Sequence, residues 1–273
     1  MLIKHAGIQL NIESIINNES RDESVFFLHG FTGSAEDWVP IVSSLNKKFN
    51  YYCVDLIGHG KSDSPSEGAY YGFESITGQL KEIITELSTG KIIIAGYSYG
   101  GRAALKFAIK NGYMLKGLIL ESSTYGISDE QIRKERIIQD NKLAEFILNN
   151  PIEIFIDHWM NSELFNTQKQ LPIEVISRIR ESKLKNNRAG LANCLKYSGT
   201  GIMGNLSRRL KDIPVKTLLI TGELDKKFTD INREMVNLIP ESKHQIIENT
   251  GHNIHLEKPQ IFIDAVNSFL SVI

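Results

Sequence analysis

The sequence predicts an α/β protein whose mostly parallel sheet is flanked by helices and interrupted by an inserted, all-helical cap. Two observations lead to this prediction. Short apolar segments alternate with longer amphipathic ones up to residue 121, and the same alternation returns near residue 215. Apolar strands separated by helices are typical of βαβ units, whose parallel sheet is buried on both faces. With 273 residues, of which 41% are hydrophobic, the chain is long enough to bury such a sheet.

Six segments are predicted to be strands, and each is followed by polar or turn-forming residues. In chain order they are Val25–Leu28, Tyr51–Asp55, Ile92–Ala95, Gly117–Glu121, Val215–Thr221 and His244–Ile247. Amphipathic spacing predicts the helices that accompany them. These are Asp37–Phe49, Glu74–Leu87, Tyr99–Asn111, Ile231–Leu238 and Gln260–Leu270.

The segment from residue 122 to residue 210 contains several helical patterns and no predicted strand. Prolines interrupt these patterns at Asn149-Asn-Pro151 and at Leu171-Pro172, and helices commonly end before a proline. We therefore predict an α/β core formed by residues 1–121 and 211–273, and a helical cap formed by residues 122–210.

Composition excludes several classes of protein. Lys and Arg total 31 against 32 Asp and Glu, so no strongly basic surface is available for nucleic acid. No apolar run approaches the roughly 18 residues of a membrane span, and the first residues do not resemble a signal peptide. Two cysteines, Cys53 and Cys194, cannot build a disulfide framework or a cysteine metal site. We expect a cytoplasmic protein with a small-molecule partner, no nucleic acid, no cofactor and no metal; the oligomeric state is not determined.

Gly96-Tyr-Ser-Tyr-Gly100 follows a predicted strand and opens a predicted helix. In that context G-x-S-x-G is typical of a nucleophile elbow, a sharp turn that projects a serine hydroxyl at the carboxyl end of the sheet. Both glycines are needed because the turn leaves no room for side chains beside the serine. Ser98 is therefore predicted to be catalytic.

A serine hydroxyl needs a base, and the base needs an orienting acid. Asp225 and His252 each follow a predicted strand, and the chain order Ser, Asp, His is the one expected for this architecture. Ser98, Asp225 and His252 are therefore the predicted triad. The alternatives are His29, His59 and His255 for the base, and Glu223 for the acid.

Negative charge that develops on a substrate oxygen near Ser98 requires preorganised donors. The backbone N–H of Tyr99, directly after the serine, is one expected donor. The N–H of Phe31, in the loop His29-Gly-Phe-Thr-Gly33, is the other.

Arg102 lies one helical turn after Ser98, on nearly the same face of the predicted helix. A guanidinium there is costly to bury unless an anion pairs with it. That anion is either a carboxylate of the protein or an acidic substrate. We favour the substrate, because arginine binds a carboxylate through two parallel hydrogen bonds.

These residues resemble a known family. Leu28-His-Gly-Phe-Thr-Gly33, Asp55-Leu-Ile-Gly-His-Gly60 and Gly251-His252 resemble landmarks of α/β-hydrolases. The narrower combination Gly96-Tyr-Ser-Tyr-Gly-Gly-Arg102 resembles 2-succinyl-6-hydroxy-2,4-cyclohexadiene-1-carboxylate synthase of menaquinone biosynthesis. Further matches span core and cap: Glu121-Ser-Ser123, Arg136-Ile-Ile-Gln-Asp140, Trp159, Leu164-Phe165, Gly190-Leu-Ala192 and Gly222-Glu-Leu-Asp-Lys-Lys-Phe228.

The resemblance implies a lyase that eliminates pyruvate from 2-succinyl-5-enolpyruvyl-6-hydroxy-3-cyclohexene-1-carboxylate, a small polycarboxylate. It also implies that Arg102, Arg136, Tyr97 and Trp159 line the substrate pocket. The family's further substrate arginine has no unique counterpart here, and Arg180, Lys183 and Arg188 compete for its place. If Lys183 takes it, a point charge replaces the arginine fork.

Two other functions remain compatible with these residues. A carboxylesterase or carbon–carbon bond hydrolase would use the same triad. A ligand-binding receptor of this fold is the non-enzyme alternative. The intact triad argues against it, because a receptor need not keep all three catalytic groups.

Overall fold

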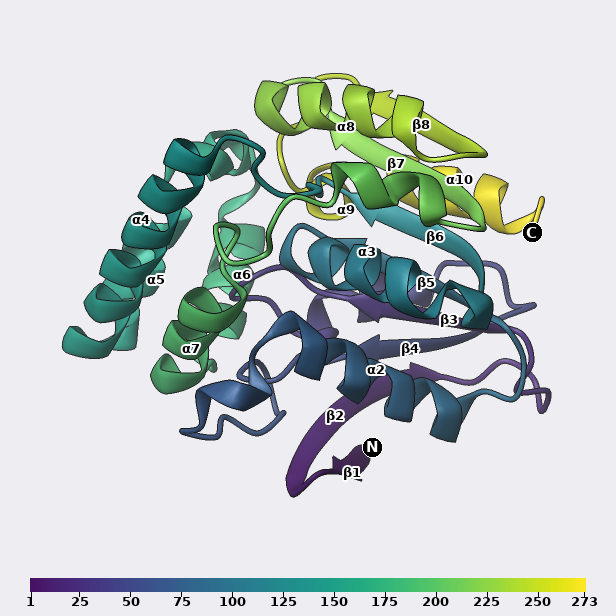
Figure 1. Cartoon of the computed structure of the whole chain (residues 1–273), viewed down its shortest axis with the longest axis horizontal. Coiled ribbons are helices and arrows are strands. Elements are labelled where there is room, and N and C mark those ends of the chain that lie inside the picture. The colour runs from purple at the N-terminus through teal and green to yellow at the C-terminus, as the bar shows by residue number, and fades with distance from the viewer.

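The computed structural model describes residues 1–273 and shows one sheet of eight strands (Figure 1). The strands are β1 (Leu2–His5), β2 (Ile8–Ile15), β3 (Ser24–Leu28), β4 (Asn50–Val54), β5 (Ile92–Tyr97), β6 (Leu115–Glu121), β7 (Lys216–Gly222) and β8 (Ser242–Ile247). Their spatial order is β1-β2-β4-β3-β5-β6-β7-β8. The β1–β2 and β2–β4 pairs are antiparallel, and every other pair of neighbouring strands is parallel. The predicted α/β class with a mostly parallel sheet is confirmed.

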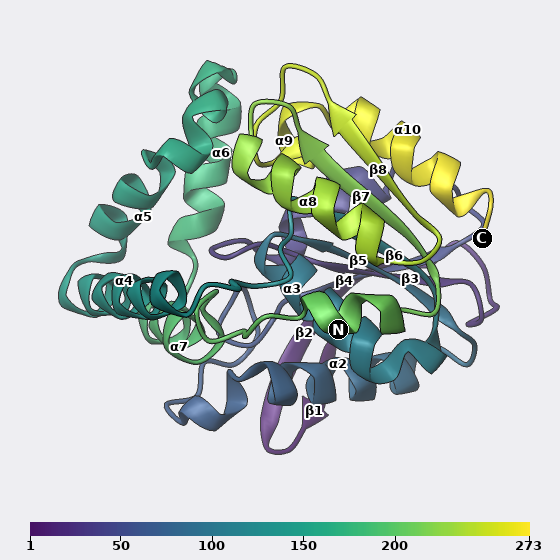
Figure 2. The ribbon, with the colours of Figure 1, turned by 45° about the horizontal axis from the view of Figure 1, so that its top comes forward.

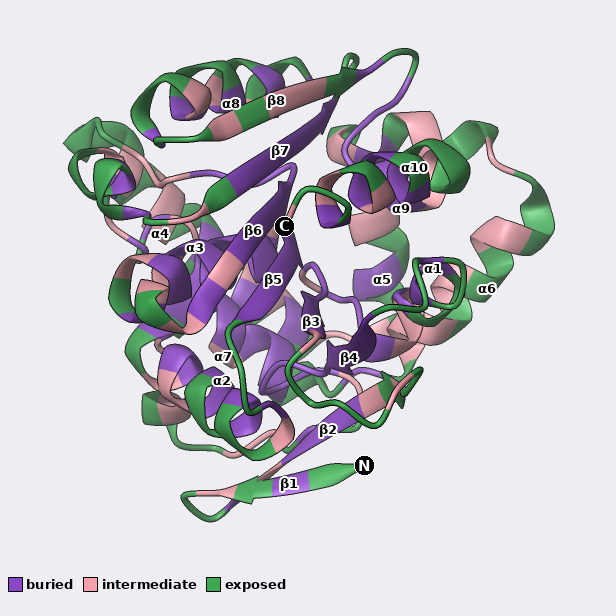
Figure 3. Cartoon of the chain, turned by 90° about the vertical axis from the view of Figure 1, so that its right-hand side faces the viewer, coloured by how far each residue is buried: buried purple, intermediate pink, exposed green.

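Helices cover both faces of the sheet. One apolar cluster joins the sheet to α2 (Phe73–Leu87), α3 (Tyr99–Asn111) and α8 (Lys226–Leu238). A second cluster joins the opposite face to α1 (Val39–Val42) and α10 (Pro259–Leu270). Every residue of β3, β4 and β5 is buried, and Figure 3 shows how burial concentrates in these central strands. Continuous apolar strands are what a sheet covered on two faces requires.

The chain between β6 and β7 contains no strand. It forms α4 (Glu130–Asn149), α5 (Ile152–Met160), the 3₁₀ segment η4 (Glu163–Gln170), α6 (Ile173–Leu184) and α7 (Arg188–Ser198). Figures 1 and 2 show these helices together at one end of the sheet. They share a small apolar cluster of their own, which includes Ile147, Phe155 and Leu191. We refer to them as the cap; the division at residues 122 and 210 stays a prediction.

Two elements differ from the sequence-based expectation. The hairpin β1–β2 was not predicted, because its strands lie at the sheet edge and carry the weaker, alternating pattern of a half-buried strand. The helix predicted over Asp37–Phe49 is reduced to a 3₁₀ turn, Ala35–Asp37, and the single turn of α1. Directly after α1, the Ser43 hydroxyl donates to the Val39 carbonyl at 2.6 Å, and such local bonds compete with helix propagation.

No helix in the structure has both the length and the apolar character needed to cross a membrane.

Candidate active site

Ser98 occupies a strained turn between β5 and α3. Its φ of 49° and ψ of −102° lie outside the ordinary regions for a residue with a side chain. A Cβ at Gly96 would lie 2.4 Å from the Gly100 carbonyl oxygen, and one at Gly100 would lie 2.3 Å from the Leu28 carbonyl oxygen. The glycines of the motif are therefore required sterically, as predicted.

The structure brings Ser98, Asp225 and His252 together. His252 Nδ1 lies 2.6 Å from Asp225 Oδ2, and His252 Nε2 lies 3.0 Å from Ser98 Oγ. An ionised Asp225 accepts only, so Nδ1 carries the proton and Nε2 is free to accept the serine proton. His252 and Asp225 are both buried, which shields their hydrogen bond from water.

The alternative residues have other partners. His29 donates from Nδ1 to the Gly30 carbonyl at 2.8 Å, while its Nε2 accepts the Leu56 N–H. His59 lies against the Ile57 carbonyl. Glu223 accepts the N–H of Asn249 and is exposed. None of these side chains is hydrogen-bonded to Ser98.

A cavity of about 550 Å³ opens onto Ser98 between the core and the cap, and we refer to it as the serine pocket. Phe31 and Tyr99 both line it, and neither of their backbone N–H groups has a protein acceptor. Free donors beside a reactive oxygen are what an oxyanion hole requires. These are the two predicted donors.

Arg102 lines the same pocket and forms no ion pair. Its Nη1 donates to the Ser198 carbonyl at 2.8 Å, and the guanidinium lies over the Tyr99 and Phe73 rings at 5.1 and 5.4 Å. Burial lowers the pKa of Arg102 to about 10, so the side chain is still charged at neutral pH. A buried cation without an acidic partner favours an anionic ligand.

Two cap residues complete this wall of the serine pocket. Arg136 on α4 reaches it while its Nε donates to the buried Asp140 carboxylate at 2.8 Å. Trp159 on α5 packs edge-on against Phe31, with ring centroids 5.3 Å apart, and its buried indole N–H has no partner. A ligand acceptor could satisfy that donor.

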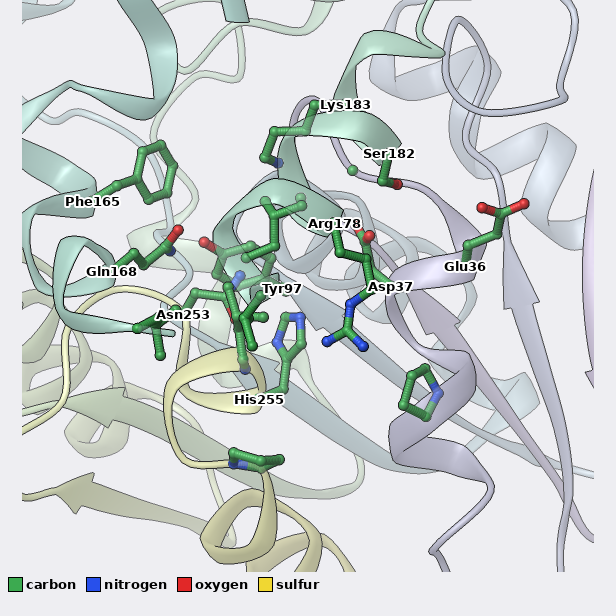
Figure 4. Close-up of a pocket in the computed structure, with 18 of the residues that line it drawn as sticks. Glu36, Asp37, Tyr97, Phe165, Gln168, Arg178, Ser182, Lys183, Asn253 and His255 are labelled. Atoms are coloured by element: carbon green, nitrogen blue, oxygen red, sulfur yellow. The ribbon is translucent and has the colours of Figure 1, made fainter. Parts of the chain in front are cut away.

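A second cavity of about 580 Å³, the adjacent pocket, lies between α6 and the core (Figure 4). Three aromatic residues, Phe31, Tyr97 and Phe165, line both cavities and form the wall they share. The aromatic wall joins core and cap, because Phe165 belongs to η4 and the other two belong to core loops and strands.

The three candidates for the further substrate cation lie in different places. Lys183 lines the adjacent pocket, donates to Thr32 Oγ1 at 3.0 Å and has its pKa lowered by burial. Arg180 lines neither pocket, because it forms a two-point pair with Asp157 at 2.6 and 3.0 Å. Arg188 is exposed and donates to the Asn150 carbonyl. Of these three, only Lys183 lines either of the two pockets.

Sequence reasoning missed two residues that contact the triad. The Phe228 ring lies tilted against the His252 ring with centroids 4.5 Å apart, and the Phe165 ring meets the same ring edge-on at 6.3 Å. Both belong to segments that carried the family resemblance, but an aromatic residue in a helical pattern is not distinguishable from ordinary core packing before the fold is known.

The family described as alpha/beta hydrolase fold matches residues 23–259 of this chain. The chain therefore belongs to the alpha/beta hydrolase fold family, the class that the sheet, the elbow and the Ser-His-Asp arrangement define.

Within that class the chain is similar to proteins of one kind. A relative from Bacillus subtilis (strain 168), provisionally named 2-succinyl-6-hydroxy-2,4-cyclohexadiene-1-carboxylate synthase, is 39% identical over 92% of this chain and 91% of its own length. The synthase of that name from Salmonella enteritidis PT4 (strain P125109) is 29% identical, covering 90% and 93%. The solved structure of MenH from S. aureus superposes with a TM-score of 0.91 at 36% identity, covering 95% of this chain and 97% of that one. The resemblance predicted from the sequence is confirmed.

Proposed function

We propose that this protein is a lyase that eliminates pyruvate from 2-succinyl-5-enolpyruvyl-6-hydroxy-3-cyclohexene-1-carboxylate, giving 2-succinyl-6-hydroxy-2,4-cyclohexadiene-1-carboxylate. The names of its relatives support this reaction. The single observation that favours it within this chain is the buried guanidinium of Arg102, which pairs with no acidic side chain and lies one helical turn from Ser98. Ser98, His252 and Asp225 are hydrogen-bonded in series.

The geometry suits removal of a proton from carbon. His252 Nε2 accepts the Ser98 proton, so the serine oxygen takes the substrate C–H proton as its own proton moves to the imidazole. Asp225 keeps Nδ1 protonated and stabilises the imidazolium that forms. The electron pair left on carbon delocalises toward a substrate carbonyl, whose oxygen faces the N–H groups of Phe31 and Tyr99.

Elimination is completed when the carbon–oxygen bond to the enolpyruvyl group breaks. The electron pair forms the new ring double bond as that oxygen departs, and the leaving group gains a proton to become pyruvate. Arg102 and Arg136 hold substrate carboxylates during this step, and Trp159 offers its free N–H. Closure of the cap over the serine pocket excludes water, which limits competing hydrolysis.

The direct test is pyruvate release by the purified protein from the cyclohexene substrate, measured beside a panel of simple esters. We expect rapid release of one pyruvate per substrate and feeble ester hydrolysis. Acid-quenched intact-mass spectrometry during turnover should show no adduct on Ser98.

A hydrolase with the same triad is the second candidate, favoured by the 3.0 Å contact between Ser98 Oγ and His252 Nε2. It would pass through an acyl-enzyme. A stoichiometric mass addition on Ser98 that forms and decays at the turnover rate would therefore contradict the lyase assignment and support the hydrolase.

A further inference from the structure

Glu121 connects the two segments that carry Ser98 and His252. It is the last residue of β6 and is buried. Its backbone carbonyl accepts the N–H of Ser98 at 2.9 Å. Its side chain crosses to the other segment, where Oε1 accepts the N–H groups of Ile254 and His255 at 2.7 and 3.0 Å. One residue thus contacts both sides of the Ser98–His252 hydrogen bond.

The segment it contacts begins immediately after the triad histidine. The short helix α9 (Ile254–Glu257) starts two residues beyond His252, and its first N–H groups have no partner within the helix. Glu121 supplies the acceptor for both. On the other side of His252, Glu257 accepts the N–H of Gly251 at 2.7 Å. Carboxylates therefore anchor the backbone before and after the histidine.

His255 extends the same arrangement to the adjacent pocket, which its side chain lines. Its Nδ1 lies 2.7 Å from Glu121 Oε2, and its ring packs on Trp38 with centroids 4.1 Å apart. It also meets the Tyr97 ring edge-on at 5.1 Å, and Tyr97 directly precedes Ser98. Figure 4 shows His255 and Tyr97 side by side at the wall of the adjacent pocket.

We propose that Glu121 is a positioning residue that sets the distance between His252 and Ser98 by holding the start of α9, with His255 fixing the orientation of its carboxylate. The inference rests on the base role of Ser98 and His252 in the proposed function. Glu121 does not line either pocket, so it acts through the backbone of the His252 segment and not on substrate.

Stability alone is a poor reason for this arrangement. Removing a carboxylate and an imidazole from water carries a desolvation penalty that an apolar pair of similar volume would avoid. A carboxylate can satisfy two N–H groups and one ring N–H at once, and an apolar pair cannot. We therefore attribute to Glu121 a geometric role: it fixes the position of the start of α9, which lies two residues after His252.

The test separates side-chain length from charge. Glu121→Gln keeps the length and the Oε1 acceptor but removes the charge, whereas Glu121→Asp keeps the charge and shortens the reach. We expect kcat of the Gln variant to stay within about 3-fold of the parent and kcat of the Asp variant to fall at least about 10-fold, because a misplacement of ~1 Å can cost roughly 100-fold. KM should change less than about 2-fold in both, since substrate contacts are intact.

A second measurement does not depend on turnover. The proton on His252 Nδ1, held by Asp225 at 2.6 Å, should give a low-field proton resonance. This resonance should be retained in Glu121→Gln and shifted or broadened in Glu121→Asp. Glu223→Asp is the matched control, because this exposed carboxylate holds the Asn249 N–H of the same loop without touching α9; it should leave kcat and the resonance unchanged.

If Glu121→Asp stays active and Glu121→Gln is impaired, the charge of Glu121 matters and its reach does not, which would contradict the positioning role. If the folded Glu121→Asp variant keeps both its kcat and its His252 resonance unchanged, the proposal is wrong. If the parent protein releases no pyruvate, the proposed function fails, while the resonance still decides whether Glu121 positions His252.

Discussion

Arg102 is the residue whose surroundings say most about the substrate. Its charge is buried, it pairs with no acid, and its only hydrogen bond to protein goes to a backbone carbonyl. An esterase acting on neutral esters has no use for a desolvated cation one turn from its serine. A polycarboxylate substrate would supply the missing anion.

Replacing Arg102 should therefore weaken catalysis through substrate contacts. We expect Arg102→Ala to lose at least about 2 kcal/mol in kcat/KM, and Arg102→Lys to recover little, because a lysine cannot form the two-point contact. Steady-state kinetics measures both. Lys106→Ala is the control, since this residue lies one turn further along α3 and contacts the Phe73 ring outside both pockets. A near-normal Arg102→Ala enzyme would rule out the carboxylate contact.

Asp225 should matter for turnover and not for affinity. Asp225→Asn removes the acceptor that selects the His252 tautomer, so kcat should fall by roughly 10³- to 10⁴-fold while the protein stays folded. Ligand binding should change little because Asp225 does not line the serine pocket. Turnover and calorimetric binding are compared in the same preparation, with the surface variant Asp230→Asn as control. Lost binding with modest loss of turnover would give Asp225 a different role.

At the scale of elements, α6 presents its basic residues to two different environments. Lys183 faces the adjacent pocket and bonds to Thr32, in the loop that also carries Phe31. Arg180, almost one turn earlier, turns outward to Asp157. Residues three apart on a helix differ by only about 60° in direction, so their roles are decided by what packs against each side.

This difference predicts separate outcomes for two equivalent substitutions. We expect Lys183→Met to raise KM about 10-fold with kcat nearly unchanged, because a charged contact to substrate is lost while the side-chain volume is kept. Arg180→Met removes only a half-exposed surface pair and should change KM by less than about 2-fold. Equal KM values for the two variants would show that Lys183 is not the counterpart of the family's further arginine.

Over the whole molecule, two buried histidines and one half-buried histidine couple stability to pH. Burial lowers the pKa of His29, His59 and His244, and that of His244 falls to about 4. In the unfolded chain each titrates near 6.5. Between about pH 6.5 and pH 4 the unfolded state therefore binds more protons than the folded state, so the free energy of unfolding decreases as the pH falls.

His244 is the most accessible place to test this coupling. Its Nε2 lies 2.8 Å from Thr221 Oγ1, between β8 and β7. We expect the urea midpoint of the parent to drop between pH 7 and pH 5, and His244→Gln to show a smaller drop, since glutamine does not titrate. The two midpoints at each pH are the measurement. An identical drop in parent and variant would exclude His244 as a contributor.

Local patterns were sufficient for the parts of the fold that depend on local chemistry. Continuous apolar runs mark β3 to β7 because both faces of those strands are buried, and Gly96 and Gly100 mark the elbow because no side chain fits there. Chain order and strand ends also pointed to Asp225 and His252 among several acids and histidines, and the structure places these two side chains in hydrogen-bond contact. These features follow from periodicity, sterics and the direction of parallel strands.

Tertiary structure decided what depends on groups far apart in the chain. Only the fold shows that Arg102 lacks an acidic partner, that Lys183 faces a cavity while Arg180 does not, and that Glu121 joins the Ser98 and His252 segments. The edge hairpin β1–β2 and the shortened α1 belong here too, because neighbouring strands and competing side-chain bonds outweigh a weak local pattern. Spacing determines which face a residue can occupy, but the partner it meets there is set by the packing of distant segments.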